Sequence, residues 1–418
     1  MTNIKPFKGL CYNEEKVGDL SRVTCPPYDV ISESEQDFYY EQSPYNYIRL
    51  VLNKNLPQDD EKDNRYSRSK VLFDEWQKVD ILRQDSKPAI YFYSQDYLVN
   101  GKELSRRGFI AAMQINESGS VLPHENTHRA PKMDRLELTK KVKANLSSIF
   151  TIFSDKHKII KSMFDDEFSK RQPDFALKDV QGVRNSIWRL TDQDKICDIA
   201  KKMEDSKAFI ADGHHRCEVS SMYLKHMKEE DRGYTSQKGY NYIMTYFTAA
   251  ESDGLSVLPI HRVFKAEVDV EKFGKIFKIE KCDSIDILED KLGSASKKHC
   301  VFGLCSKGEL FVLQLKDKNI VESDFIKKDC FKDLDVAIVD NYVLAELLGI
   351  EKSAITYLKE ASQAKDMVDQ DQGNVAFFMR PTTVEQIKDV ALCGEKMPPK
   401  STYFYPKLLS GLVAYPFE

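Results

Sequence analysis

Five consecutive residues combine a carboxylate, a glycine, two imidazoles and a guanidinium: Asp212, Gly213, His214, His215 and Arg216. They follow an apolar run, 208–211, and precede residues that recur at helical spacing, so the sequence predicts a strand, a tight turn and a helix N-terminus. Free backbone N–H groups and the positive end of the helix dipole favour an anion at such a turn. Gly213 permits close approach of the backbone, and Arg216 adds a permanent charge suited to phosphate. We therefore expect residues 212–216 to bind a phosphate group.

Two other interpretations of this motif stay open. Asp212 could simply cap a helix whose two histidines pack or face solvent. His214 and His215 could hold a metal, but adjacent residues of a helix point about 100° apart and rarely share one ion, so no metal site is expected. Cys217, directly behind the arginine, is expected to face the core rather than to react.

A second group of reactive side chains begins at His124 and Glu125. With His128 they match the H-E-x-x-H pattern, which in zinc peptidases places two histidines on one helix face. Pro123 and Pro131 enclose the segment and it has almost no apolar residues to bury a helix, so a zinc site is disfavoured. We expect a functional loop in which Glu125 is a general base and His124 a second polar group. An ordinary polar loop is the alternative.

Further polar residues are candidate members of the same site: Lys400, Ser401, Thr402, Asp134, Arg135, His261 and Arg262. The first three lie beside prolines near the C-terminus and offer donors for phosphate oxygens, although a packed C-terminal arm fits them equally well. The Asp-Arg pair opens a predicted helix, where a cap and a surface charge would suffice. The His-Arg pair could add positive charge.

The elements that must position these residues alternate between strands and helices. Strands are predicted at 90–93, 109–113, 149–153, 187–190, 240–249 and 375–379, and helices at 70–80, 133–145, 158–170, 192–203 and 334–348. Asn100-Gly101 and Lys307-Gly308 predict hairpin turns. The alternation indicates an α/β or α+β chain of mixed sheets with flanking helices. We expect a main domain at 1–264 and a smaller α+β region at 265–418, whose final arm returns to the site.

Composition limits the classes of function. The 418 residues carry 62 basic against 66 acidic side chains, a formal net charge of -4, so broad nucleic-acid binding is not expected. The nine cysteines are scattered singly, which argues against a disulfide framework and a structural zinc site. No stretch approaches the roughly 18 apolar residues of a membrane span, and a soluble, cytoplasmic protein is expected. The oligomeric state stays open.

Several motifs together resemble the bacterial and archaeal domain-of-unknown-function family 1015, over essentially the whole chain. They lie at residues 6–10, 26–31, 43–46, 124–125, 134–135, 144–147, 210–216, 258–262 and 397–404. His128 falls outside the family pattern, and Cys217 stands where the family usually has an aromatic residue. The family name carries no established reaction.

The turn at 212–216 is also similar, over a short span, to the phosphate loop of the superfamily of ParB-type proteins, sulfiredoxins and free-serine kinases. That resemblance implies nucleotide phosphates at 212–216 and Glu125 as the base. We therefore expect a phosphotransferase that uses ATP or ADP with Mg²⁺ on a small hydroxylated metabolite, free serine being the best single candidate. Asp212 or the nucleotide alone would hold the Mg²⁺, and His215 would assist. A nucleotide-binding regulatory switch and a phosphomonoester hydrolase are the alternatives.

Overall fold

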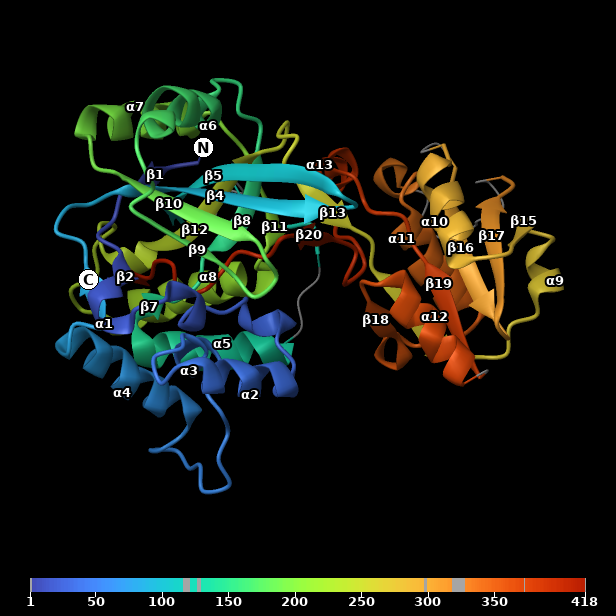
Figure 1. Ribbon diagram of the computed structural model, residues 1–418, viewed down its shortest axis with the longest axis horizontal. Coiled ribbons are helices and arrows are strands. Elements are labelled where there is room, and N and C mark those ends of the chain that lie inside the picture. The colour runs from blue at the N-terminus through green and yellow to red at the C-terminus, as the bar shows by residue number, and fades with distance from the viewer. Residues whose placement is uncertain are drawn as a thin grey trace. The chain divides into compact units, whose positions relative to one another are not determined.

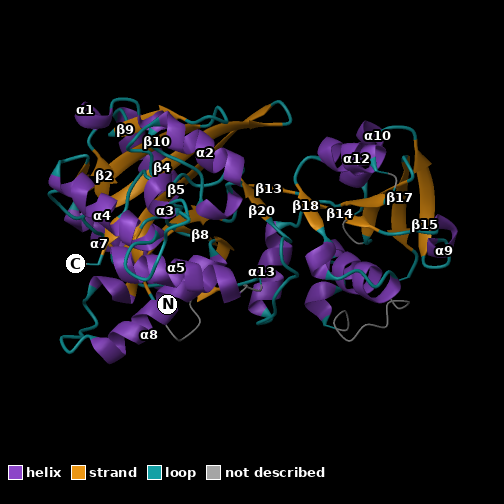
Figure 2. Cartoon of the chain, turned by 90° about the horizontal axis from the view of Figure 1, so that it is seen from below, coloured by secondary structure: helices purple, strands orange, loops and turns teal. Residues whose placement is uncertain are grey.

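The computed structural model describes residues 2–115, 121–125, 129–296, 299–317, 328–371 and 373–417. The chain folds into mixed sheets flanked by helices, which confirms the predicted fold class (Figure 2). It divides into two compact units. Unit 1 comprises Met1–Leu122, Thr127–Leu255 and Pro406–Glu418, and unit 2 comprises Pro123–Asn126 and Ser256–Tyr405. The domain boundary at 264/265 stays a prediction.

Unit 1 is built on a nine-stranded sheet, in the order β6-β11-β8-β12-β5-β4-β10-β9 with β1 also beside β5. Its strands are β1 (Ile4–Lys5), β4 (Ile90–Val99), β5 (Lys102–Gln114), β6 (Val121–Leu122), β8 (Ile149–Phe153), β9 (Phe175–Lys178), β10 (Arg184–Leu190), β11 (Ala208–Asp212) and β12 (Tyr242–Ala249). β6 runs parallel to β11 and β8 parallel to β12, and the other neighbours are antiparallel. Two short pairs form separate two-stranded sheets: β2 (Leu10–Tyr12) with β3 (Leu82–Gln84), and β7 (Ala144–Asn145) with β21 (Tyr415–Pro416).

Helices cover both faces of this sheet. They are α1 (Glu14–Val17), α2 (Glu33–Gln42), α3 (Ile48–Val51), α4 (Arg65–Lys78), α5 (Arg129–Val142), α6 (Ile159–Ser162), α7 (Gln193–Glu204) and α8 (His214–Glu230). Figure 1 shows α6 and α7 on one face and α8 with α5 on the other. Ile196, Ile199 and Met203 of α7 recur at helical spacing and pack into the core of the sheet. On the opposite face, Tyr223 of α8 clusters with Leu136 of α5.

Unit 2 has a smaller, wholly antiparallel sheet of six strands in the order β15-β17-β16-β19-β14-β18. Its strands are β14 (His261–Lys265), β15 (Phe277–Cys282), β16 (Val301–Ser306), β17 (Glu309–Leu315), β18 (Thr356–Leu358) and β19 (Asn374–Phe378), and β13 (Ser256–Leu258) pairs separately with β20 (Tyr403–Tyr405). The helices are α9 (Val270–Phe273), α10 (Ile285–Ser294), α11 (Asp335–Ala337), α12 (Ala361–Gln370) and α13 (Val384–Leu392). Leu288 of α10 and Val368 of α12 pack against Phe378 in its core.

Both predicted hairpin turns are confirmed. Asn100 and Gly101 join β4 to β5 with φ of 49° and 74°, and Lys307 and Gly308 join β16 to β17 with φ of 52° and 80°. Two successive left-handed residues form the tight turn that matches the twist of a hairpin.

Four predicted helices differ from the structure. The helix predicted at 70–80 is α4, which begins earlier, at Arg65, and ends at Lys78. α5 begins and ends earlier than 133–145, and Asn145 is a strand residue whose side chain accepts the Met244 N–H at 2.8 Å. The helix at 158–170 leaves α geometry after Ser162, where Phe164 and Phe168 pack against Phe92 of the sheet. The helix at 334–348 likewise continues from α11 as a π-helix, Ile338–Leu347. Tertiary packing overrides the periodic pattern in these segments.

Candidate functional site

The predicted strand, turn and helix at 208–216 are confirmed. β11 ends at Asp212, Gly213 adopts φ 90° and ψ 29°, and α8 begins at His214. A Cβ at Gly213 would lie 3.0 Å from the Arg216 guanidinium and would sit on a left-handed backbone, so the position suits glycine. Because the residue that precedes α8 is a glycine, it has no side chain to cover the first N–H groups of the helix.

Asp212 is the counter-ion of two cations rather than a helix cap. Its carboxylate accepts a hydrogen bond from Arg216 at 2.6 Å and another from the Lys407 ammonium. Arg216 also donates to the Ser148 carbonyl. Burial raises the pKa of Asp212, but the charges of Lys407 and Arg216 outweigh it and hold that pKa well below its ordinary value. Two cationic side chains therefore share one carboxylate at the start of α8.

Lys407 is the member of this cluster that the sequence did not place in the site. Its side chain is 12% exposed, as is that of Arg216, and that of Asp212 is 14% exposed. The only local signal was its position at the end of the basic, proline-bounded segment that begins near Lys400.

The two histidines differ in burial. His214 is buried and its charge contributes to the low pKa of Asp212, whereas His215 is half-buried. Cys217 packs against the core of the sheet, as expected. Burial, followed by the charge of Glu218, raises the pKa of its thiol to about 12, so it carries no reactive thiolate near neutral pH.

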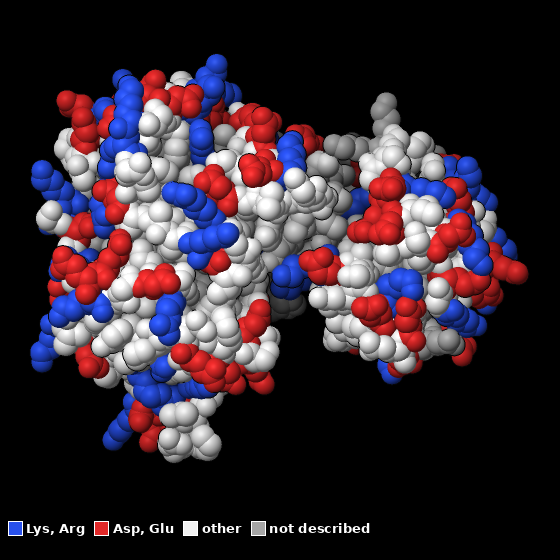
Figure 3. Space-filling model, viewed as in Figure 1, with Lys and Arg blue, Asp and Glu red and all other residues white. Residues whose placement is uncertain are grey.

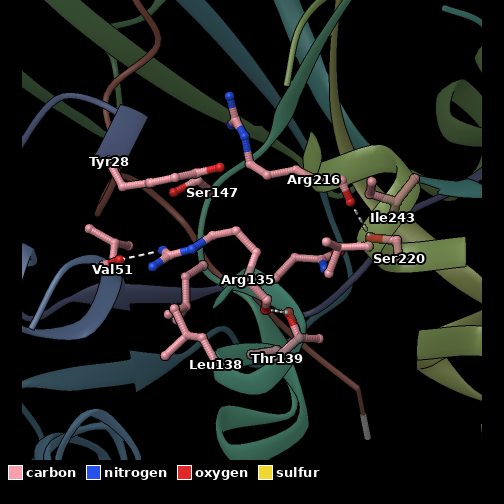
Figure 4. Close-up of a pocket in the computed structure, with 13 residues that line it drawn as sticks. Tyr28, Val51, Arg135, Leu138, Thr139, Ser147, Arg216, Ser220 and Ile243 are labelled. Carbon is pink, nitrogen blue, oxygen red and sulfur yellow. Dashed lines mark hydrogen bonds between the residues drawn. The ribbon is translucent and has the colours of Figure 1, made fainter. Parts of the chain in front are cut away.

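A pocket lies beside the first two turns of α8. It is lined by Tyr28, Val51, Arg135, Leu138, Thr139, Ala144, Asn145, Leu146, Ser147, Arg216, Val219, Ser220 and Ile243, and its cavity volume is about 50 Å³ (Figure 4). Arg135 points towards the Val51 carbonyl, to which it donates, and its guanidinium stacks 4.0 Å from the Tyr28 ring centre. The two candidate arginines, Arg135 and Arg216, therefore border one small cavity.

Asp134 belongs to the second turn of α5 and not to its start. It bonds Arg135 at 2.7 Å and the Tyr66 hydroxyl at 2.7 Å, and it also pairs with Arg65. Arg135 is 7% exposed, so it is a buried residue and not a surface charge. Asp134 fixes the orientation of Arg135 along the pocket wall.

In unit 2 the structure brings His124, Glu125 and Thr402 together. The Thr402 hydroxyl donates to Glu125 Oε1 at 3.0 Å, and His124 Nε2 lies 3.2 Å from the same hydroxyl oxygen. The Met397 N–H donates to the His124 carbonyl at 2.6 Å and holds the two segments side by side. His124 is fully buried, and the Glu125 side chain is 17% exposed. A partly exposed carboxylate in contact with a hydroxyl group is suited to accept a proton.

The neighbouring candidates Ser401 and Lys400 have other environments. Ser401 is buried and its hydroxyl donates to the Pro398 carbonyl at 2.6 Å, within its own loop. Lys400 is exposed and has φ 59°. Glu125 forms an isolated bridge with Met397 and is not helical, and His128 lies outside the described residues.

His261 and Arg262 lie inside the sheet of unit 2. Arg262 is fully buried and forms two hydrogen bonds with Asp340, at 2.9 and 3.2 Å. His261 accepts the Met379 N–H on Nδ1 at 3.2 Å. Burial, and then the charge of Arg262, lowers the pKa of His261 to about 4. Both side chains are engaged within the core of unit 2.

On each unit, the face in Figure 3 mixes basic and acidic side chains. In the described part of the chain, no three His, Cys, Asp or Glu side chains are grouped so that they could hold a metal ion. Among the same residues, no helix is both long and apolar enough to cross a bilayer.

A model of the family described as "Protein of unknown function (DUF1015)" matches residues 4–337. The chain belongs to the DUF1015 family. This confirms the resemblance drawn from the motifs. No curated protein matches the sequence.

Three solved structures are similar to this DUF1015 chain at low identity. A conserved hypothetical protein from Pyrococcus furiosus is 14% identical with a TM-score of 0.33, over 69% of this chain and 89% of that one. A free serine kinase in complex with AMP is 13% identical with a TM-score of 0.34, over 68% and 83%. SbnI with a C-terminal truncation, from Staphylococcus aureus, is 10% identical with a TM-score of 0.38, over 72% and 85%.

Proposed function

We propose that this protein is a nucleotide-dependent phosphotransferase that acts on a small hydroxylated metabolite, with free serine as the best single candidate. One observation carries the proposal: Arg216 and Lys407 share the single carboxylate of Asp212 beside the glycine-led start of α8. A phosphate placed there would meet backbone N–H groups, the positive end of a 17-residue helix and two partly exposed cations.

The assigned roles follow from this chemistry. Gly213 and the N–H groups behind it would bind phosphate oxygens, and His214, His215 and Arg216 would neutralise the charge that develops during transfer. ATP or ADP would be the donor. Both carboxylate oxygens of Asp212 already accept hydrogen bonds from cations, so the nucleotide's own phosphates are the better ligands for Mg²⁺.

Glu125 is the proposed general base. The acceptor hydroxyl oxygen would bond to the terminal phosphorus, the bond to the bridging oxygen would break, and the hydroxyl proton would pass to Glu125. The nucleotide then leaves with one phosphate fewer. Thr402 and His124 would orient the carboxylate through the hydrogen bonds that join them. Lys400 is assigned a supporting role in phosphate binding, and Ser401 would have to release its hydrogen bond to the Pro398 carbonyl to contribute.

The test is to incubate the full chain with Mg²⁺, L-serine and either ATP or ADP, and to follow ³¹P NMR signals for a new phosphomonoester. Glu125→Gln should lower turnover about 10²- to 10⁴-fold and leave nucleotide affinity unchanged, because a glutamine oxygen still accepts from Thr402. Glu385→Gln, an exposed residue of α13, is the matched control. Nucleotide binding without any product would instead support a regulatory switch, and phosphate release from phosphoserine without nucleotide would support a hydrolase.

A further inference from the structure

A buried polar network crosses the sheet of unit 1 and ends at the backbone that carries Lys407. Gln95 of β4 and Arg106 of β5 are both fully buried, and Asn185 of β10 is 1% exposed. Arg106 donates to the Gln95 side-chain oxygen and to the Pro406 carbonyl. Gln95 donates to the Lys407 carbonyl at 3.0 Å.

The same network is anchored on its far side. Gln95 also donates to Asn185 Oδ1 at 3.0 Å, and the Tyr93 hydroxyl donates to the same oxygen at 2.5 Å. Asn185 in turn donates to Asp179 at 3.2 Å. Gln95 is therefore held on both of its polar atoms and cannot rotate without breaking several hydrogen bonds.

Burying this network is costly. The Arg106 guanidinium lies 4.6 Å from the Phe150 ring centre and 5.9 Å from that of Tyr246, in a part of the sheet that aromatic side chains could fill. Burying a charge or an amide costs several kcal/mol unless its hydrogen bonds are satisfied. The network fixes the backbone at 406–407 through its hydrogen bonds to the two carbonyl groups there. A lysine loses side-chain entropy when it is ordered, so a fixed backbone favours its contact with Asp212.

We propose that Gln95 and Arg106 are positioning residues of the phosphate site: they hold the backbone at 406–407 so that the Lys407 ammonium reaches Asp212. The role of these residues in phosphate binding rests on the proposed function. The measurement of Lys407 reactivity that tests their effect on the backbone does not. Both side chains would thus have a functional role although they touch neither the nucleotide nor the acceptor.

The first test needs no ligand. Reductive methylation of the full chain by formaldehyde, quantified by mass spectrometry, should be about tenfold faster at Lys407 in Gln95→Met than in the wild type, relative to the exposed Lys141. The control is Asn46→Leu, which removes another fully buried amide that donates to backbone carbonyls, at Arg22 and Thr24. It should lower stability similarly and leave Lys407 protected. Unchanged protection of Lys407 in Gln95→Met would overturn the inference.

The second test separates positioning from general destabilisation. Gln95→Met should weaken binding of inorganic phosphate about tenfold in calorimetry, and this effect should vanish in a Lys407→Met background. An equal loss in both backgrounds would show that Gln95 does not act through Lys407. If Lys407 becomes reactive as expected but the wild type binds neither phosphate nor nucleotide, the proposed function fails while the positioning role stands.

Discussion

Both units contain an arginine bound to an aspartate. The two arrangements differ in the number of cations that contact the carboxylate and in the exposure of the side chains to solvent. In unit 2, Arg262 and Asp340 are 0% and 2% exposed at their side chains and oppose one charge with one charge. In unit 1, Asp212 faces both Arg216 and Lys407, and these side chains are 12–14% exposed. A sealed, balanced pair has no charge left for a ligand. The open cluster keeps two cations partly exposed beside one carboxylate.

The local backbone explains the difference. Arg262 lies within a strand that has neighbours on both sides, β18 and β19. Asp212 is the last residue of its strand, and Gly213 turns the chain directly into a helix. A basic residue after an apolar run is therefore buried within the sheet where the strand continues, and it lies beside a partly exposed turn where the strand stops.

The largest expected effect is on the sealed pair. Arg262→Met leaves the Asp340 carboxylate buried without a partner, so the free energy of unfolding should fall by about 3–5 kcal/mol, measured by urea denaturation. Adding Asp340→Leu should restore most of that loss. Phosphate affinity of the folded protein should not change. A loss of phosphate affinity in the double variant would show that this pair also serves a ligand.

The open cluster should show the opposite pattern, a large loss of activity and a smaller loss of stability. Arg216→Met should lower turnover about 10²- to 10³-fold because it removes a charge that stabilises the transferred phosphate. It should cost less stability than Arg262→Met, since Lys407 still neutralises Asp212. Steady-state kinetics and urea denaturation measure the two effects. Arg184→Met, an exposed residue of β10, is the control and should change neither.

As the pH falls, His261 of unit 2 should reduce the stability of the protein at a higher pH than Asp212 of unit 1 does. The pKa of His261 is lowered to about 4 in the folded state, from 6.5, so the unfolded chain binds a proton first as the pH falls. Stability is therefore lost between about pH 6.5 and 4, by up to about 3 kcal/mol. The Asp212 pKa is also lowered, but an acid with a lowered pKa loses its contribution only below its unfolded value of 3.8. His261→Asn should flatten the loss between pH 6.5 and 4, and an unchanged slope would refute this assignment.

The smallest effect concerns the turn. Gly213→Ala should cost about 1–2 kcal/mol for a left-handed backbone, and its Cβ should also displace the Arg216 guanidinium, 3.0 Å away. Gly308→Ala is the matched control, because its φ is 80° and no atom lies within 4 Å of the added Cβ. Both variants should lose similar stability in urea, but only Gly213→Ala should weaken phosphate binding. Equal phosphate affinities would place the anion elsewhere.

Local features of the sequence predicted local features of the fold. Strand β8 occupies the predicted residues 149–153, and both hairpin turns lie at their Asn-Gly and Lys-Gly pairs. The turn at Gly213 was also predicted, because strand, glycine and helix periodicity follow each other without a gap. These features depend on neighbours within a few residues.

Contacts between distant segments could not be predicted in this way. Lys407 reaches Asp212 across 195 residues, and no spacing in the sequence records that pairing. Arg262 has the same local appearance as a site residue, and only the strands beside it and Asp340 show that it is buried. The gathering of Glu125 with Thr402 likewise depends on the bridge to Met397.

The distance along the chain between Asp212 and Lys407 sets an order of assembly. A ribosome that adds about 5–20 residues per second needs about 10–40 s to extend the chain by the 195 residues from Asp212 to Lys407. During that interval the strand, the turn and the helix around Gly213 can fold, but the Lys407 ammonium is not yet available to Asp212. A nascent chain that stops within unit 2 would thus carry the motif without its contact to Lys407, and we expect it to lack the proposed activity.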